Sequence, residues 1–168
     1  MKRVCTLTRG TLGVLLLGVA MAAGDALAQT AQDLVGTWTL VSAINEHGGN
    51  KTDIYGPQPK GILTVDANGR YVLVIARADL PKVASSNRIR ATPEENKAIV
   101  QGSIAHFGTV FANAADKTIT FKIETSLFPK WDGTEQQRPF TITGDELTYT
   151  VPSASGGGTA TVVWKRAK

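Results

Sequence analysis

Glu124 and Arg138 are the pair of residues in this sequence whose types and spacing are best suited to chemistry. Each lies in a segment typical of a β-strand, and only the Phe128 to Thr134 loop separates the two segments. If the strands pair, the side chains can meet across the ladder as a charge-assisted, bidentate pair. Facing inward, the pair would anchor a ligand carboxylate or carbonyl, or act as an acid/base pair. Facing outward, as alternation with Phe121 and Ile123 suggests, it would be a surface ion pair worth under about 1 kcal/mol.

Trp131 is the second candidate, because it lies outside any expected strand, in that same loop. There it would either stack on a ligand at the mouth of a pocket or cover the end of the core. Acid/base catalysis on a confined substrate would need an inward-facing group, for which Glu124, His106 and Tyr149 are the candidates.

The sequence lacks the residue patterns of metal binding and of nucleophilic catalysis. Cys5 is the sole cysteine, and the two histidines, His47 and His106, have no partner at a metal-binding spacing. No Gly-x-Ser-x-Gly nucleophile motif occurs. We therefore expect no metal site and no cofactor.

The first 28 residues have the pattern of a secretory signal peptide. Lys2, Arg3 and Arg9 precede an apolar run, Leu12 to Ala23, and the small residues of Ala26-Leu27-Ala28 follow it. The run is shorter than the roughly 20 residues that span a membrane. We expect cleavage after about Ala28, a periplasmic or secreted domain of residues 29–168, and no membrane span after processing. Part of the +4 net charge lies in the removed segment, and no basic stripe remains to favour nucleic acid.

Eight segments with apolar alternation and turn residues between them predict an antiparallel sheet. Asn68-Gly69 between two apolar runs is a strong hairpin signal. The expected strands are Gly36 to Ile44, Gly61 to Val65, Arg70 to Arg77, Phe107 to Ala112, Thr118 to Ser126, Glu135 to Ile142, Glu146 to Val151 and Thr159 to Arg166.

One short helix is expected between the third and fourth strands. Thr92 is its cap, Pro93 its first residue, and Glu95 can close a capping box. Ile99, Val100, Ser103, Ile104 and Phe107 share one helical face, which predicts packing over one end of the barrel or against its side. Sequential hairpins favour a closed, all-β, up-and-down barrel over a sandwich.

Short motifs along nearly the whole domain resemble one known family. They are Gly36-Thr37-Trp38, Pro59-Lys60-Gly61-Ile62-Leu63, Asn68-Gly69-Arg70-Tyr71, His106-Phe107-Gly108-Thr109-Val110-Phe111, Pro129-Lys130-Trp131-Asp132-Gly133, Gln136-Gln137-Arg138-Pro139-Phe140, Gly144-Asp145-Glu146-Leu147 and Val163-Trp164-Lys165-Arg166. Together they are similar to the bacterial and fungal lipocalin-like domain family. The resemblance implies that Trp38 closes one end of the barrel and that Arg166 packs across it.

A barrel of eight strands has room for about one small ligand, so we expect a small hydrophobic or amphipathic molecule to be the partner. The alternatives are a cyclase- or isomerase-type barrel enzyme, or a solidly packed barrel that binds an envelope protein through an apolar patch. The residues expected to line the pocket are Leu40, Ile62, Leu73, Phe107, Phe121, Trp131, Arg138, Phe140 and Tyr149.

Overall fold

A computed structural model describes residues 31–168 of the chain. The segment expected to be a signal peptide, residues 1–28, lies outside the described residues. The helical elements are α1 (Ala31–Leu34), η1 (Arg88–Arg90), α2 (Pro93–Gln101) and η2 (Pro129–Trp131). The strands are β1 (Gly36–His47), β2 (Asn50–Asp53), β3 (Lys60–Val65), β4 (Arg70–Ala76), β5 (Ser103–Asn113), β6 (Thr118–Ser126), β7 (Glu135–Thr143), β8 (Glu146–Val151) and β9 (Thr159–Arg166).

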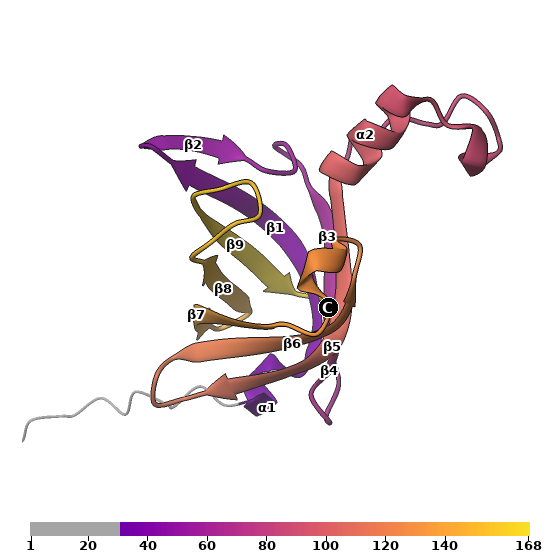
Figure 1. Cartoon of the computed structure of the whole chain (residues 1–168). Coiled ribbons are helices and arrows are strands. Elements are labelled where there is room, and N and C mark those ends of the chain that lie inside the picture. The colour runs from indigo at the N-terminus through magenta and orange to yellow at the C-terminus, as the bar shows by residue number, and fades with distance from the viewer. Residues whose placement is uncertain (1–30) are drawn as a thin grey trace, which may run out of the picture.

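The sheet closes into a barrel. Sequential antiparallel pairs run from β3 to β9, and β1 pairs with both β3 and β9, which joins the first strand to the last. The eight strands β1 and β3 to β9 therefore form the up-and-down barrel that the alternation predicts (Figure 1). Strand β2 is an addition, because β1 runs beyond the barrel and folds back on itself as a hairpin.

The turns are built where the sequence indicates them. In the β3–β4 hairpin, the Asp66 carboxylate accepts hydrogen bonds from the backbone N–H groups of Asn68 and Arg70, both at 2.8 Å. Gly69 takes a φ of 76°, a conformation that favours glycine. This turn sets the register that pairs Leu63 with Leu73 inside the barrel.

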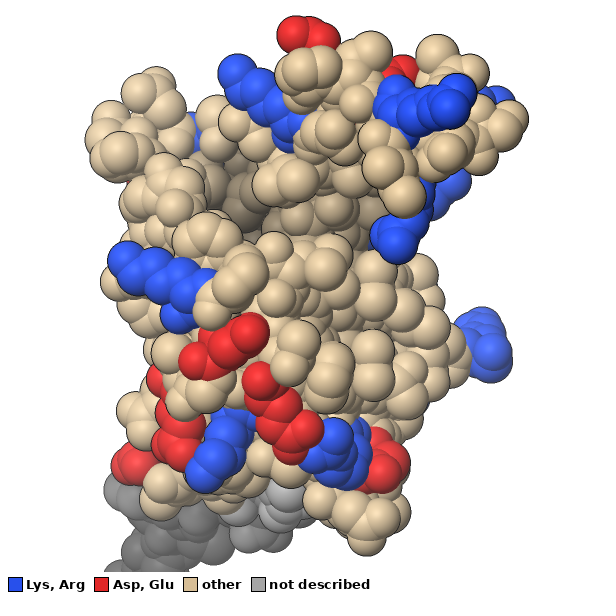
Figure 2. Space-filling view, turned by 45° about the vertical axis from the view of Figure 1, so that its right-hand side comes forward, with Lys and Arg blue, Asp and Glu red and all other residues tan. Residues whose placement is uncertain are grey.

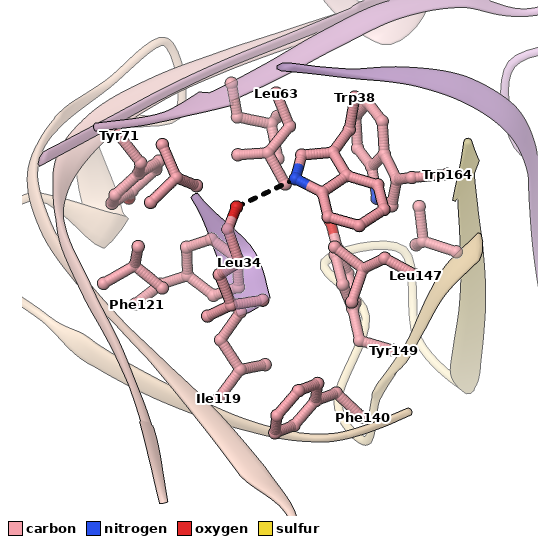
Figure 3. Close-up of a cluster of buried hydrophobic side chains, with 14 of the residues drawn as sticks. Leu34, Trp38, Leu63, Tyr71, Ile119, Phe121, Phe140, Leu147, Tyr149 and Trp164 are labelled. Carbon is pink, nitrogen blue, oxygen red and sulfur yellow. Dashed lines mark hydrogen bonds between the residues drawn. The ribbon is translucent and has the colours of Figure 1, made fainter. Parts of the chain in front are cut away.

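The closed end of the barrel is a packed apolar core (Figure 3). Trp38 is fully buried there, and its indole N–H donates to the carbonyl of Leu34, 2.9 Å away, at the end of α1. The guanidinium of Arg166 lies 4.1 Å from the centre of the Trp38 ring and donates to the carbonyls of Val35 and Asp33. The first strand, the last strand and α1 are thus tied together at this end.

Helix α2 lies between the third and fourth barrel strands, with Thr92 and Glu95 forming the expected capping box. The expected helical face, which ran to Phe107, was wrong in its second half, because the helix ends at Gln101 and β5 begins at Ser103. Ser103 and Phe107 pair with β4, and this ladder replaces further helical turns. The expected packing was also wrong: α2 buries no residue and projects from the barrel on the arm formed by residues 77–102 (Figure 1).

The outer face of β3, β4 and β5 is apolar and open. Ile62, Val72, Val74 and Phe107 are each at least 40% exposed, so α2 does not pack against this side of the barrel, which was one of the two expected positions. Figure 2 shows an uncharged band across this face, with acidic and basic side chains gathered below it. Among the described residues, no helix is long and apolar enough to cross a membrane.

Candidate functional site

A cavity of about 210 Å³ opens at the end of the barrel opposite α1. Three segments between barrel strands contribute to its walls, namely β2 with the residues that follow it, the η2 loop and the connection between β8 and β9. The lining residues are Ala43, Asn45, Thr52, Ile54, Tyr55, Leu73, Ile75, Ile104, His106, Trp131, Arg138, Tyr149, Val151, Ala154, Ser155, Gly156, Ala160 and Val162. Most of these side chains are apolar, as in pockets that hold small organic molecules.

Arg138 is the main polar feature of the cavity. It lies on β7, points into the barrel and is only 3% exposed. Its guanidinium carbon lies 4.5 Å from the ring centre of Phe121 and 5.0 Å from that of Tyr149. One terminal nitrogen donates to the side-chain oxygen of Gln136 at 2.6 Å. The aromatic rings and this amide hold the guanidinium in one place.

The charge on Arg138 is not neutralised within the described chain. The ion pairs formed by the described residues do not include Arg138. Its Nε is buried and, among those same residues, lacks a hydrogen-bond partner. A buried cation normally has an anionic partner, because removal from water costs several kcal/mol. The guanidinium is therefore available to a group from outside the chain.

His106 and Tyr71 form a second polar element beside Arg138. The Tyr71 hydroxyl and His106 Nδ1 lie 2.8 Å apart, and both residues are buried. Trp131 stands edge-on to the His106 ring, with 5.9 Å between the ring centres. The loop that carries Trp131 is held by Asp132, whose carboxylate accepts the N–H of Ser126 at 2.7 Å. Trp131 is thus fixed at the cavity wall.

The titratable groups around the cavity, Arg138 apart, are uncharged at neutral pH. Burial, assisted by the positive charge of Arg138, lowers the pKa of His106 to about 3. Burial raises the pKa of Tyr55 to about 12, and it also raises the pKa values of Tyr71 and Tyr149. The described lining residues include no Asp, Glu or Lys. The cavity therefore carries one net positive charge.

The family assignment follows from comparison with known proteins. The family model described as a lipocalin-like domain matches residues 35–167, which covers the whole barrel. This chain belongs to the lipocalin-like domain family. A search of curated proteins found no match to it. The resemblance seen in the short motifs is confirmed.

The structure of this lipocalin-like protein separates the predicted lining residues into three groups. Leu73, Trp131, Arg138 and Tyr149 line the cavity. Leu40, Phe121 and Phe140 point inward but are buried in the core away from the cavity wall.

Ile62 and Phe107 form the third group. They were expected inside the barrel, but both side chains point outward and are exposed. Ile62 pairs with Val74, and Phe107 pairs with Val72, all on the outer face. Both faces of these strands are apolar, so alternation alone does not distinguish inside from outside.

The expected pairing of Glu124 with Arg138 is also corrected. Glu124 points outward and forms a two-point ion pair with Arg70 of β4, while Arg138 lies opposite Ile119. Glu124 falls at the β-bulge where the β5–β6 register shifts between Phe107 and Gly108. Its carboxylate is thereby directed at Arg70, and the hydrogen bond from Arg70 lowers the pKa of Glu124.

Several lining residues carry no sequence signal. Tyr55 and Ala154 lie in loops, and Ala43 and Ala160 are small residues on strands. Asn45 donates to the carbonyl of Gly157 at 3.0 Å, and its own side-chain oxygen is buried without a partner among the described residues. Alternation counted from Trp38 and Leu40 would place Asn45 outside, and it is the bulge between Leu40 and Ser42 that turns Asn45 inward. Among the described residues, no group of three or more potential metal ligands comes together.

Buried, neutral His106 makes the stability of this lipocalin-like protein sensitive to mild acid. The unfolded chain binds a proton at His106 near pH 6.5, whereas the folded protein binds it near pH 3. The stability contribution is fully present above pH 6.5 and is lost as the pH falls toward 3. We expect the free energy of unfolding to fall by about 2 kcal/mol between pH 7 and pH 5.

Urea denaturation at several pH values measures this loss. The His106→Gln variant should lose much of the dependence between pH 7 and pH 5. His47→Gln is the matched control, because His47 is exposed in the β1–β2 hairpin, and it should behave like the wild type. Equal pH dependence in the two variants would contradict the assignment.

Proposed function

We propose that this lipocalin-like protein is exported and binds one small, mainly apolar molecule in the barrel cavity. The observation that supports binding is the 210 Å³ cavity with apolar walls at the open end of a closed barrel. A cavity of about 150 Å³ holds benzene, so this one suits a ligand of roughly ten non-hydrogen atoms. The signal-peptide pattern of residues 1–28 supports export.

Binding fits the cavity better than catalysis does. An acid/base enzyme would need a group that exchanges protons near neutral pH. The pKa of His106 lies near 3 and that of Tyr55 near 12, and Glu124 points away from the cavity. The exposed apolar face of β3 to β5 would suit the alternative of a barrel that binds an envelope protein. That alternative also required a solidly packed barrel, whereas this barrel has a cavity.

Native mass spectrometry of the protein recovered from the periplasm of an expression host tests the proposal. A discrete added mass that disappears on denaturation, and reappears in a solvent extract, supports an occupied cavity. The mass of the chain itself tests the removal of residues 1–28. A chain of full length, recovered only from the cytoplasm, would contradict export.

Filling the cavity should weaken the binding of an apolar ligand. Ala160 lies on β9 and lines the cavity, whereas its neighbour Thr161 points outward. We expect Ala160→Leu to weaken binding of octan-1-ol at least about tenfold, because a larger side chain takes up space that the ligand needs. Isothermal titration calorimetry measures the affinity. Thr161→Leu is the control and should bind as the wild type does. Equal loss in both variants, or in neither, would contradict binding in the cavity.

A further inference from the structure

We infer that the molecule held in the cavity is a small monocarboxylic acid whose carboxylate pairs with Arg138. The inference rests on the proposed binding function and names the chemical class of the ligand. It starts from one juxtaposition, a guanidinium fixed in an apolar cavity with no carboxylate of the described chain beside it.

Arg138 is arranged to receive a ligand rather than to support the fold. A structural arginine in a barrel would be expected to pair with a carboxylate, as Arg70 does with Glu124 on the outside. Arg138 instead has two neutral partners, the Gln136 amide at one terminal nitrogen and the Tyr149 hydroxyl, and its buried Nε is unpartnered among the described residues. Stacking against Phe121 and Tyr149 orients the plane of the guanidinium, so its free N–H groups keep a set direction.

The charge of the cavity selects a monoanion. Arg138 is the one charged group among the described lining residues at neutral pH, since His106 and the tyrosines are neutral there. A single negative charge neutralises it. A phosphate dianion would leave a surplus negative charge in an apolar cavity, which is costly. A carboxylate is also planar and matches the fork of N–H donors on a guanidinium.

The rest of the wall requires the body of the acid to be apolar and short. Leu73, Ile75, Ile104, Val151 and Val162 supply aliphatic surface, and Trp131 supplies an aromatic edge. The volume limits the body to a medium-length alkyl chain or a single ring.

A matched pair of probes, octanoate and octan-1-ol, tests the inference on the protein purified from the periplasm of the expression host, by isothermal titration calorimetry. The two molecules have similar shapes and differ in charge. We expect the wild type to bind octanoate about tenfold to hundredfold more tightly than octan-1-ol, because a charge-assisted hydrogen bond forms with the acid alone. Arg138→Met should remove this preference and still bind octan-1-ol. Arg70→Met is the control for an arginine on the outside and should keep the preference.

Arg138→Gln provides a second variant should Arg138→Met fail to fold, and it too should lose the preference for the acid. Equal affinity of the wild type for acid and alcohol would overturn the acid ligand and leave the binding function standing. Failure to bind either probe would count against both proposals. Displacement of octanoate by inorganic phosphate at equal concentration would overturn the carboxylate class.

Discussion

Gly108→Ala is expected to lower the free energy of unfolding by about 3 kcal/mol or more. Gly108 is buried on β5, at the point where the β5–β6 register shifts. A Cβ there would overlap the backbone carbonyl oxygen of Lys122 and lie 3.0 Å from the backbone nitrogen of Glu124. Both atoms belong to β6, so relief of the clash would require the two strands to move apart. Urea denaturation followed by far-ultraviolet circular dichroism measures the loss.

Gly156→Ala is the matched control for this prediction. Gly156 lies in the loop between β8 and β9, and a Cβ there would meet no atom within 4 Å. Its stability should be unchanged, or raised by up to about 1 kcal/mol, because alanine restricts the unfolded chain. If Gly108→Ala were as stable as Gly156→Ala, the close approach of β5 and β6 would be contradicted.

Trp38→Ala is expected to lower the free energy of unfolding by about 3 to 5 kcal/mol. The side chain is fully buried at the closed end of the barrel, donates a hydrogen bond to Leu34 and supports Arg166. Its removal leaves a cavity among large side chains and detaches α1 from the core (Figure 3). A domain is stable by only about 5 to 15 kcal/mol in total, so this variant should be partly unfolded at physiological temperature.

Two further variants separate the contributions of Trp38. Trp38→Phe keeps an aromatic ring but leaves the Leu34 carbonyl unpaired, and it should cost about 1 to 3 kcal/mol. Val41→Ala on the same strand removes a half-exposed side chain and should cost less than about 1 kcal/mol. Denaturation in urea ranks the three. A Trp38→Ala variant no less stable than Val41→Ala would contradict the role of the indole at the closed end.

The candidate site was only partly predictable from the sequence. Arg138 and Trp131 stood out by residue type, and both line the cavity. The partner proposed for Arg138 was wrong, because the bulge beside Gly108 directs Glu124 outward to Arg70. A bulge adds one residue to one strand of a pair. The alternation of apolar residues in a single sequence does not show where that extra residue falls relative to the partner strand.

The sequence by itself determined the features that depend on neighbouring residues. These are the positions of the barrel strands along the chain, the turn at Asp66 to Gly69 and the capping box of Thr92 and Glu95. Alternation, turn residues and helix caps are all preferences of residues close together in sequence.

Only the tertiary structure decided which apolar face of β3, β4 and β5 fills the barrel and where α2 gives way to a strand. Only the tertiary structure also decided that Arg138 has no anionic partner among the described residues. Those outcomes depend on pairing between strands that are distant in sequence. The free energy that selects them comes from burial and cross-strand contacts that exist only once the barrel has closed.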